Sequence, residues 1–331
     1  MVKMAQYGTQ HGHGLGKLRA MMEHADVEFA GVFEPNEALR QKVSHSELGL
    51  SVHWFGSEDE MLEDESIVAV ASEGRNVESL GQTEAIVKKG KHVWYDKPAG
   101  DDWHHWQKVL ASARDQQLQI QMGYMFRYHE GYCKIGEWVK GGLLGEVFQI
   151  RAHMSTLLNS SQREAIAVHM GGILYDLAAH QLDQIVWLLG RPERVTTFLR
   201  NDSGEVAQFF DNTLGVFEYK QAMVMLDISA LETRPAARRF EVYGSRGSAI
   251  MDPMEPADQI RLCLDEAREG YEAGINTVPV TTQSRHDLYM LELDSFLAAV
   301  QGQKEPDRSY AHELLVQETL LRATGRIDSS N

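Results

Sequence analysis

The residues with the clearest potential for chemistry lie in the segment Gly171–His180, which has the sequence GGILYDLAAH. In this segment an acid, Asp176, precedes an imidazole, His180, by four residues at the start of a helical pattern. Residues at i and i+4 share one helical face, and the apolar residues of this pattern fall on the opposite side. Asp176, His180 and Asp183 are therefore predicted to form a polar stripe, which either faces water or lines a site.

A second chemical candidate is Lys97, which stands directly before Pro98 at the end of a predicted strand. Ligands of open α/β sheets bind at the carboxyl ends of the parallel strands. Proline disfavours a helical backbone at Lys97, and this restricts where the side chain points. A lysine in a closed site can move a proton, whereas most lysines at strand ends are solvated. This segment alone leaves both interpretations open.

The segment Gly8–Gly14, with the sequence GTQHGHG, connects the first predicted strand to the first predicted helix. A doubly wound fold binds the pyrophosphate of a dinucleotide at this place, on the helix N-terminus. The usual G-x-G-x-x-G spacing from Gly8 would need glycines where this chain has Gln10 and His13. The position of the loop thus predicts a dinucleotide site more strongly than its spacing does.

Glu34 ends the second predicted strand. An acid at this position accepts hydrogen bonds from the adenosine ribose hydroxyls and repels a 2′-phosphate. The alternative is an acid at the start of the next helix, before Pro35, attracted by the helix dipole. Its place in the βαβ unit favours the ribose role, and with it NAD over NADP.

The first third of the chain alternates strand and helix patterns, which is typical of a doubly wound parallel sheet. The predicted strands cover residues 2–7, 27–33, 67–71 and 92–95, and the predicted helices cover residues 15–24, 37–45 and 77–89. After residues 119–123 the rhythm changes to consecutive strands. Helices are predicted at 132–140, 171–189, 287–300 and 311–323, and strands at 145–154, 194–199, 212–219, 222–228, 239–243 and 248–251.

These patterns predict two domains. Residues 1–123 form an α/β Rossmann domain that binds a dinucleotide, and residues 124–331 form an α+β domain with a mainly antiparallel sheet, which binds substrate and joins subunits. Whether the two closing helices pack back on the first domain stays open at this stage.

The composition limits the class of partner. The chain has 331 residues and a net charge of −16, which disfavours nucleic acid and anionic membranes. No apolar run approaches the length of a membrane span and no secretion signal is recognised, so we expect a cytoplasmic protein. The two cysteines, Cys133 and Cys263, form no CxxC pair, which fits a reducing compartment.

A metal site is the remaining chemical alternative, because the chain has 14 histidines, including His11, His13 and the adjacent pair His104 and His105. Without a HExxH helix or a cysteine set we predict no metal. The other interpretation of His104 and His105 is a helix surface behind an acidic N-terminus, and that of His11 and His13 is a loop that caps the first helix.

Together these segments resemble the Gfo/Idh/MocA family of NAD(P)-dependent oxidoreductases, which includes inositol and sugar dehydrogenases. Asp96-Lys97-Pro98 is similar to the family's Glu-Lys-Pro motif, and Gly171–His180 to its Gly-Gly-x-x-x-Asp-x-x-x-His motif. Gly123–Tyr128 resembles the segment that enters the substrate domain, and Gly141–Gly145 the turn before its first long strand. The resemblance covers nearly the whole chain.

The resemblance implies a Rossmann domain followed by a domain with an open, largely antiparallel sheet. It implies that Lys97, Asp176 and His180 are catalytic. His180 would accept or donate the proton, Lys97 would hold the reacting oxygen, and Asp176 would bind hydroxyls and orient the imidazole. Asp96 stands where the family has glutamate, and residues 72–76, SEGRN, lack the family's Thr-Pro-Asn sequence apart from Asn76.

The predicted site residues follow from these motifs and from proximity to them. The expected cofactor-binding residues are Gly8, Gln10, His11, Gly12, His13, Glu34, Ser72, Glu73, Asn76, Asp96, Lys97 and Pro98. The expected substrate-binding residues are Lys97, Arg127, Tyr128, Arg163, His169, Tyr175, Asp176 and His180. We predict an NAD-dependent dehydrogenase that transfers a hydride between a secondary alcohol of a sugar or cyclic polyol and nicotinamide.

Two other functions stay open. One is a glycosidase on the same scaffold that uses a tightly held NAD to oxidise the sugar transiently. The other is a non-catalytic sensor of NAD or sugar. The resemblance further implies a homodimer or homotetramer joined through the open face of the second sheet.

Overall fold

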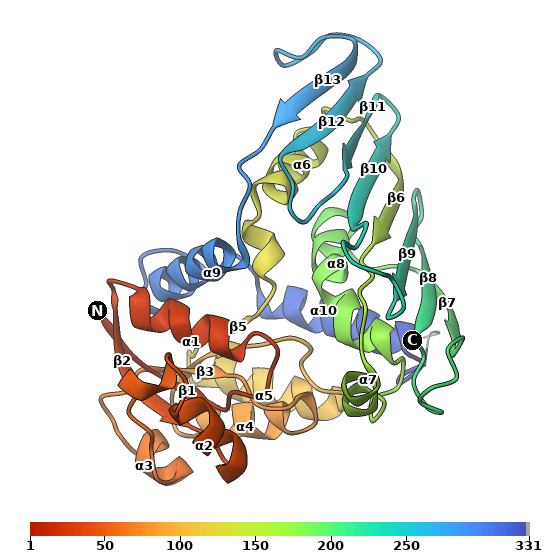
Figure 1. Cartoon of the computed structure of the whole chain (residues 1–331). Helices are drawn as coiled ribbons and strands as arrows, with labels where there is room; N and C mark the ends of the chain where they lie inside the picture. The colour runs from red at the N-terminus through yellow and green to blue at the C-terminus, as the bar shows by residue number, and fades with distance from the viewer. Residues whose placement is uncertain (329–331) are drawn as a thin grey trace. The chain divides into compact units, whose positions relative to one another are not determined.

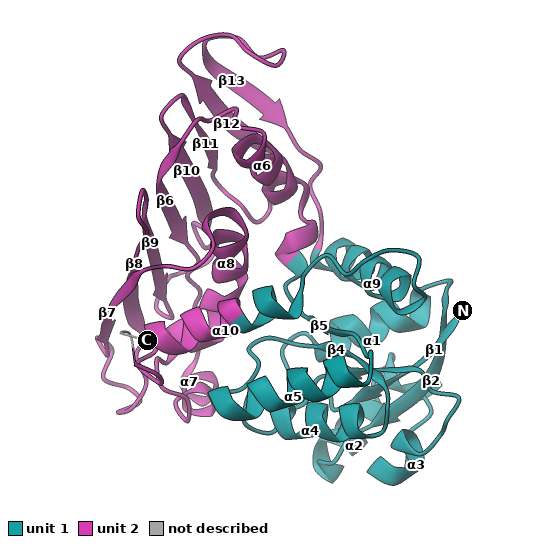
Figure 2. Cartoon of the chain, turned by 180° about the vertical axis from the view of Figure 1, so that it is seen from behind, with its two compact units in different colours: residues 1–125, 285–314 teal, residues 126–284, 315–331 magenta. Residues whose placement is uncertain are grey.

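The computed structural model describes residues 1–328, and the chain divides into two compact units (Figure 2). The first unit comprises residues 1–125 and 285–314, and the second comprises residues 126–284 and 315–331. The change of unit near residue 125 lies close to the predicted boundary at 123. The second change of unit falls within the last helix, α10 (Tyr310–Ala323).

The first unit contains a five-stranded parallel sheet in the order β2-β1-β3-β4-β5. Its strands are β1 (Val2–Tyr7), β2 (Val27–Phe33), β3 (Ala69–Ser72), β4 (His92–Tyr95) and β5 (Ile120–Met122). Its helices are α1 (Gly14–Glu23), α2 (Glu37–Ser44), α3 (Glu58–Leu62), α4 (Asn76–Lys88), α5 (Trp103–Asp115) and α9 (Arg285–Val300), with a 3-10 turn η1 (Gly49–Ser51). The predicted Rossmann fold is confirmed.

Helices pack on both faces of this sheet (Figure 1). α1 packs against α9, and α4 packs against α5. A hydrogen bond of 2.8 Å between His24 Nε2 and Asp294 Oδ1 joins α1 to α9. The chain goes from β1 to β2 on one side and then crosses back to β3 on the other side of β1, so the direction of strand addition reverses at β1. The β1–α1 loop and the β3–α4 loop meet at this point of the carboxyl edge, which is the usual place for a ligand in this architecture.

The second unit contains an eight-stranded sheet in the order β13-β12-β11-β10-β6-β9-β8-β7, in which only the β6–β9 pair is parallel among the described strands. Its strands are β6 (Val147–His153), β7 (Arg194–Arg200), β8 (Asn212–Glu218), β9 (Met223–Ser229), β10 (Arg239–Gly244), β11 (Gly247–Met251), β12 (Gln259–Leu264) and β13 (Gly274–Pro279). Its helices are α6 (Glu130–Lys140), α7 (Ser160–Ile166) and α8 (Ile173–Leu189), after a 3-10 turn η2 (Met125–Tyr128). The mainly antiparallel sheet is as predicted, whereas α7, β12 and β13 were not predicted.

Helix α8 packs on one face of this sheet, over β9 and β8 (Figure 1). On β9 the side chains of Val224, Leu226 and Ile228 are buried, and those of Met225 and Asp227 between them are partly exposed. This alternation is typical of a sheet covered on one face only. Among the described residues, no helix combines the length and the apolar character that a membrane span needs.

Two glycines fix the start of α8. Gly171 and Gly172 have φ angles of +93° and +54°. A Cβ on Gly172 would lie 2.4 Å from the backbone oxygen of Phe210, and that oxygen accepts a hydrogen bond of 2.9 Å from the Ile173 N–H. The Gly-Gly pair of the motif is thus needed for the backbone to turn against the loop before β8.

We predict that Gly172→Ala lowers the free energy of unfolding by roughly 2–4 kcal/mol, because it adds both strain at positive φ and a clash with the backbone. Gly190→Ala is the matched control. It has a φ of +75° with no atom within 4 Å of its added Cβ, so it carries the backbone strain without the clash and should cost roughly 1–2 kcal/mol. Urea denaturation measures both, and equal losses would contradict this account.

Candidate active site

The β1–α1 and β3–α4 loops of the first unit are packed together at two glycines. Gly8 has a φ of +78°, and a Cβ there would lie 2.8 Å from the Cα of Gly74. The His11 N–H donates to the Glu73 carbonyl at 2.9 Å. A Cβ on Gly12, in contrast, would meet no atom within 4 Å. The β1–α1 loop is therefore fixed against the β3–α4 loop at Gly8 and His11, whereas Gly12 borders open space.

Glu34, at the carboxyl end of β2, accepts four hydrogen bonds from its own chain. The Thr9 N–H and the Thr9 hydroxyl each donate to Oε2 at 2.7 Å, and Gln10 Nε2 donates to Oε1 at 3.1 Å. The Asn36 N–H also donates to Oε1, at 2.9 Å. The buried carboxylate thus anchors the β1–α1 loop, and Gln10 reaches it from the position where the standard fingerprint has glycine.

A buried cluster of charged and ionisable groups lies beside this loop. Both oxygens of Asp96 lie 3.1 Å from His13 Nδ1, and Oδ2 lies 3.4 Å from His11 Nδ1. The ammonium of Lys17 lies 3.1 Å from Asp96 Oδ2 and 2.9 Å from Glu73 Oε1. The cluster brings together four predicted cofactor-binding residues: His11, His13, Glu73 and Asp96. His13 stands at the N-cap of α1, but its side chain makes no capping hydrogen bond.

Burial and charge act in opposite directions on these groups. Burial lowers the pKa of His13 to about 4, although the nearby Asp96 carboxylate opposes this. Burial raises the pKa of Glu73 well above its usual range, despite the neighbouring Lys17. At Asp96 the penalty of burial is outweighed by His11, His13 and Lys17, so its pKa lies well below the usual value. These surroundings therefore favour the charged form of Asp96 more strongly than that of Glu73.

The geometry of His11, His13 and Asp96 also has the features of a metal-binding group, because their ligand-type atoms lie within 4.8 Å of one another. Lys17 already provides a positive charge 3.1 Å from Asp96 Oδ2. A divalent ion at the same carboxylate would have to lie close to this ammonium, and the repulsion between them in a buried site is unfavourable. We therefore interpret the cluster as a network of ion pairs within the first unit and not as a metal site.

Lys97 is the second residue after β4 and is buried. Its backbone N–H donates to Asp96 Oδ1 at 2.8 Å, and the peptide bond to Pro98 is cis. Asn76 begins α4 and lines a cavity of about 490 Å³ together with Tyr7 and Gly100. This cavity borders the carboxyl end of β1, the first turns of α4 and the start of α5. Ser72 lies at the end of β3, where its hydroxyl accepts a hydrogen bond from Thr83.

In the second unit the two glycines of the Gly171–His180 motif precede α8, and Ile173–His180 form about its first two turns. Asp176 is partly exposed in the first turn, where its charge matches the positive end of the helix dipole. His180 is buried, and its ring contacts that of Phe126 edge to face, with 5.2 Å between centroids. Asp176 and His180 thus follow one face of a rigid helix, as predicted. Lys97 belongs to the first unit.

The sequence left open that Asp176, His180 and Asp183 face water. This is wrong for His180 and Asp183, which are both buried. Asp183 is fully buried and accepts hydrogen bonds of 3.0 and 2.7 Å from Nε and Nη2 of Arg127. The Arg127 guanidinium also stacks over the Trp187 ring at 4.4 Å. This ion pair joins η2 to α8. Arg127 therefore has a structural partner, and its role as a substrate ligand stays a prediction.

The other predicted substrate residues come from η2, α7, the segment between α7 and α8, and the start of α8. The rings of His169 and Tyr175 stack at 4.3 Å, with an angle of 15° between their planes. Arg163 is buried on α7, and its Nη1 contacts Ser203 and Glu205 at 3.0 Å each. Tyr128, in η2, is partly exposed.

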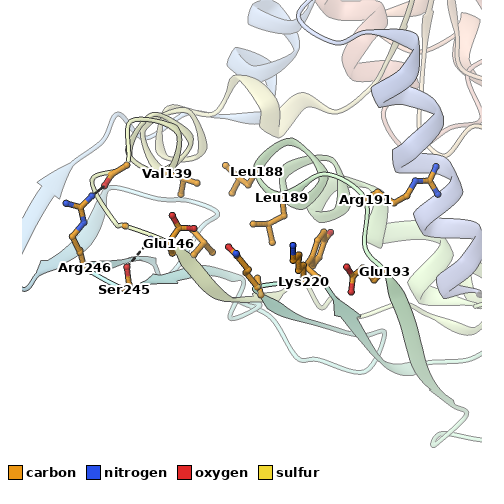
Figure 3. Close-up of a pocket in the computed structure, with 15 residues that line it drawn as sticks. Val139, Glu146, Leu188, Leu189, Arg191, Glu193, Lys220, Ser245 and Arg246 are labelled. Carbon is orange, nitrogen blue, oxygen red and sulfur yellow. Dashed lines mark hydrogen bonds between the residues drawn. The ribbon is translucent and has the colours of Figure 1, made fainter.

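A separate cavity of about 710 Å³ lies at the opposite end of α8 (Figure 3). Leu188 and Leu189 border it from the helix, and Lys220 and Arg246 border it from the turns between strands. Asp176 precedes Leu189 by 13 residues on this helix, which corresponds to about 20 Å. This cavity is distinct from the motif.

Sequence analysis missed Lys17. Its side chain is fully buried, and the buried residues of α1 include Gly14, Lys17, Leu18 and Met21. These positions repeat at helical spacing, and a lysine among them was a usable signal, because the inner face of a helix is normally apolar. Glu292 on α9 was missed as well. Burial raises its pKa to about 7.

Comparison with known proteins matches both units to family models. Residues 8–124 match the oxidoreductase family with an NAD-binding Rossmann fold, and residues 132–250 match the GFO/IDH/MocA C-terminal domain. The chain belongs to the Gfo/Idh/MocA family. The Rossmann unit of a Gfo/Idh/MocA protein is NAD-binding, so the chain is an oxidoreductase with NAD as cofactor.

Relatives within the family include sugar-metabolising enzymes. The uncharacterized oxidoreductase YdgJ of Escherichia coli is 29% identical over 178 residues, which span 53% of this chain and 51% of that protein. The 1,5-anhydro-D-fructose reductase of Ensifer adhaerens is 21% identical over 76% of this chain and 74% of its own. The structure of GenD2 from gentamicin A biosynthesis, in complex with NAD, has a TM-score of 0.81 at 19% identity and covers 97% of this chain and 93% of its own.

The pKa of His13 predicts an acid sensitivity of the fold. Because the folded state resists protonation of His13 down to about pH 4, while an unfolded histidine takes up a proton near ~6.5, stability falls as the pH drops between these values. His13→Gln removes this contribution, so the loss of stability on going from pH 7 to pH 4.5 should be smaller than in the wild type by roughly 2 kcal/mol.

Urea denaturation at both pH values measures the effect. His104→Gln, on the exposed surface of α5, is the control and should keep the wild-type pH dependence. An unchanged pH dependence in His13→Gln would show that this imidazole does not resist protonation.

Proposed function

We propose that the chain is an NAD-dependent dehydrogenase that oxidises a secondary alcohol of a sugar or cyclic polyol, or runs this reaction in reverse. The observation that carries the proposal is the Asp176/His180 pair, held one turn apart on α8 by the Gly171-Gly172 turn. The retained Lys97 motif at the carboxyl end of β4 supports it, as does the relative named as a sugar reductase.

The first unit fits the cofactor. α1 starts directly after the β1 loop with no acid in its first turn, which suits a pyrophosphate at the helix N-terminus. No atom lies within 4 Å of a Cβ built on Gly12, so the loop before α1 is open at this residue. Glu34 lies at the end of β2, where a ribose hydroxyl would compete with Gln10 for a hydrogen bond to Oε1. Its charge disfavours a 2′-phosphate, so NAD is preferred over NADP. We assign cofactor binding to this unit and substrate binding to the second.

The roles of the three motif residues follow from their chemistry. NAD, when bound, supplies the nicotinamide that accepts the hydride. His180 accepts the proton of the reacting hydroxyl at Nδ1 or Nε2, which suits an imidazole near neutral pH. Lys97 holds the reacting oxygen through its ammonium. Asp176 accepts hydrogen bonds from neighbouring hydroxyls and helps to orient the imidazole.

The test is NADH formation at 340 nm with a panel of aldoses and cyclic polyols. In His180→Ala, kcat should fall about 10²- to 10⁴-fold, because proton transfer loses its acceptor. The Kd for NADH should change less than about twofold, since His180 lies in the substrate unit. The exposed His104→Ala is the control and should leave both values unchanged.

Equal turnover in His180→Ala would contradict the proposed role. Glycoside cleavage without accumulation of NADH would instead indicate the hydrolase. NADH binding with no turnover of any substrate in the wild type would indicate the sensor.

A further inference from the structure

The first unit holds a buried ammonium that neither motif explains. Lys17 lies on the inner face of α1, and none of its side chain is exposed. Its Nζ lies 2.9 Å from Glu73 Oε1, 3.1 Å from Asp96 Oδ2, and 4.2 Å from the centroid of the Trp94 ring. A charge removed from water in this way is costly unless it is paired. Two carboxylates and an indole face provide that pairing.

The surrounding groups keep Lys17 charged. Burial alone would lower its pKa, but Asp96, Glu73 and Glu292 together outweigh the penalty and raise it. Glu292 reaches the cluster from α9, Glu73 from the β3–α4 loop and Asp96 from the end of β4. Lys17 is therefore the ammonium around which acids from three other segments of the unit are arranged.

Asp96 connects this ammonium to the predicted catalytic lysine. Its Oδ2 contacts Lys17 Nζ at 3.1 Å, and its Oδ1 accepts the Lys97 N–H at 2.8 Å. A carboxylate held at both oxygens has a fixed orientation. The backbone of Lys97 is thus attached to α1 through one side chain and two short contacts.

We infer that Lys17 is a positioning residue for Lys97, acting through the Asp96 carboxylate that both residues contact. The inference rests on the proposed catalytic role of Lys97. Without the ammonium, Asp96 and Glu73 would face each other in a buried site, and Asp96 would keep only the two histidines and the Lys97 N–H among the partners described above. The carboxylate would turn or take up a proton, and the Lys97 backbone would lose its fixed acceptor.

The experiment is a double-mutant cycle on turnover. Lys17→Met should lower kcat about 10- to 100-fold, as expected when a reacting group is misplaced by about 1 Å, with the KM for the alcohol changed less than about threefold. Asp96→Asn should have a similar effect, and the double variant should be no worse than the worse single variant. Additive losses, or a change in KM alone, would overturn the inference.

Arg19→Met is the matched control. Arg19 lies on the same helix, is exposed, and pairs with Glu23 at 2.7 Å, so its loss should leave kcat unchanged. If Lys17→Met does not fold, the cycle is run in a Glu73→Gln background, which removes the second buried carboxylate. The same coupling between positions 17 and 96 is expected there.

A second measurement does not depend on turnover. Acetylation of Lys97 by a water-soluble N-hydroxysuccinimide ester, followed by mass spectrometry, reports how well this buried side chain is held. The rate should rise at least about fivefold in Lys17→Met, while that of the exposed Lys88 stays unchanged. An unchanged Lys97 rate would overturn the inference. A wild type that protects Lys97 but turns over no alcohol would contradict only the proposed function.

Discussion

The carboxylate of Asp96 is the group on which the site of the first unit depends. It accepts the Lys97 N–H and contacts His11, His13 and Lys17, so it joins the cofactor loop and α1 to the end of β4. A buried carboxylate with this many partners stays ionised because their combined attraction exceeds the cost of burial. The loop lacks the standard glycine spacing, and this network provides a fixed conformation in its place.

The second unit also contains buried polar side chains, and they are paired with partners on neighbouring elements. Helix α8 is buried along most of its length, although it carries Asp183, His180 and Gln181. Each buried polar group needs a partner. Asp183 is paired with Arg127, and Gln181 accepts a hydrogen bond of 3.0 Å from the Tyr132 hydroxyl. These contacts fix the rotation of α8, and that rotation determines the direction in which Asp176 and His180 face.

Much of this could be predicted from the sequence, because hydrophobic periodicity is a local property. The alternating strands and helices predicted the Rossmann sheet, and the spacing of Asp176 and His180 predicted their shared face. Pairing across long separations could not be predicted in this way. The burial of Lys17 depends on Asp96, 79 residues later in the chain. Similarly, β12 and β13 are short strands that lie beyond a turn with Pro253 and Pro256, and their strand structure depends on pairing, of β12 with β11 and of β13 with β12.

The central claim is that the first unit binds NAD, and that Glu34 makes its affinity for NAD higher than that for NADP. Titration of the purified protein with NADH and NADPH, followed through the fluorescence of its six tryptophans, tests this most directly. The account predicts saturable binding of NADH at least about tenfold tighter than that of NADPH, a difference of ~1.4 kcal/mol. Equal or tighter binding of NADPH would contradict the role of Glu34, and no binding of either, in protein shown to be free of cofactor, would contradict the claim itself.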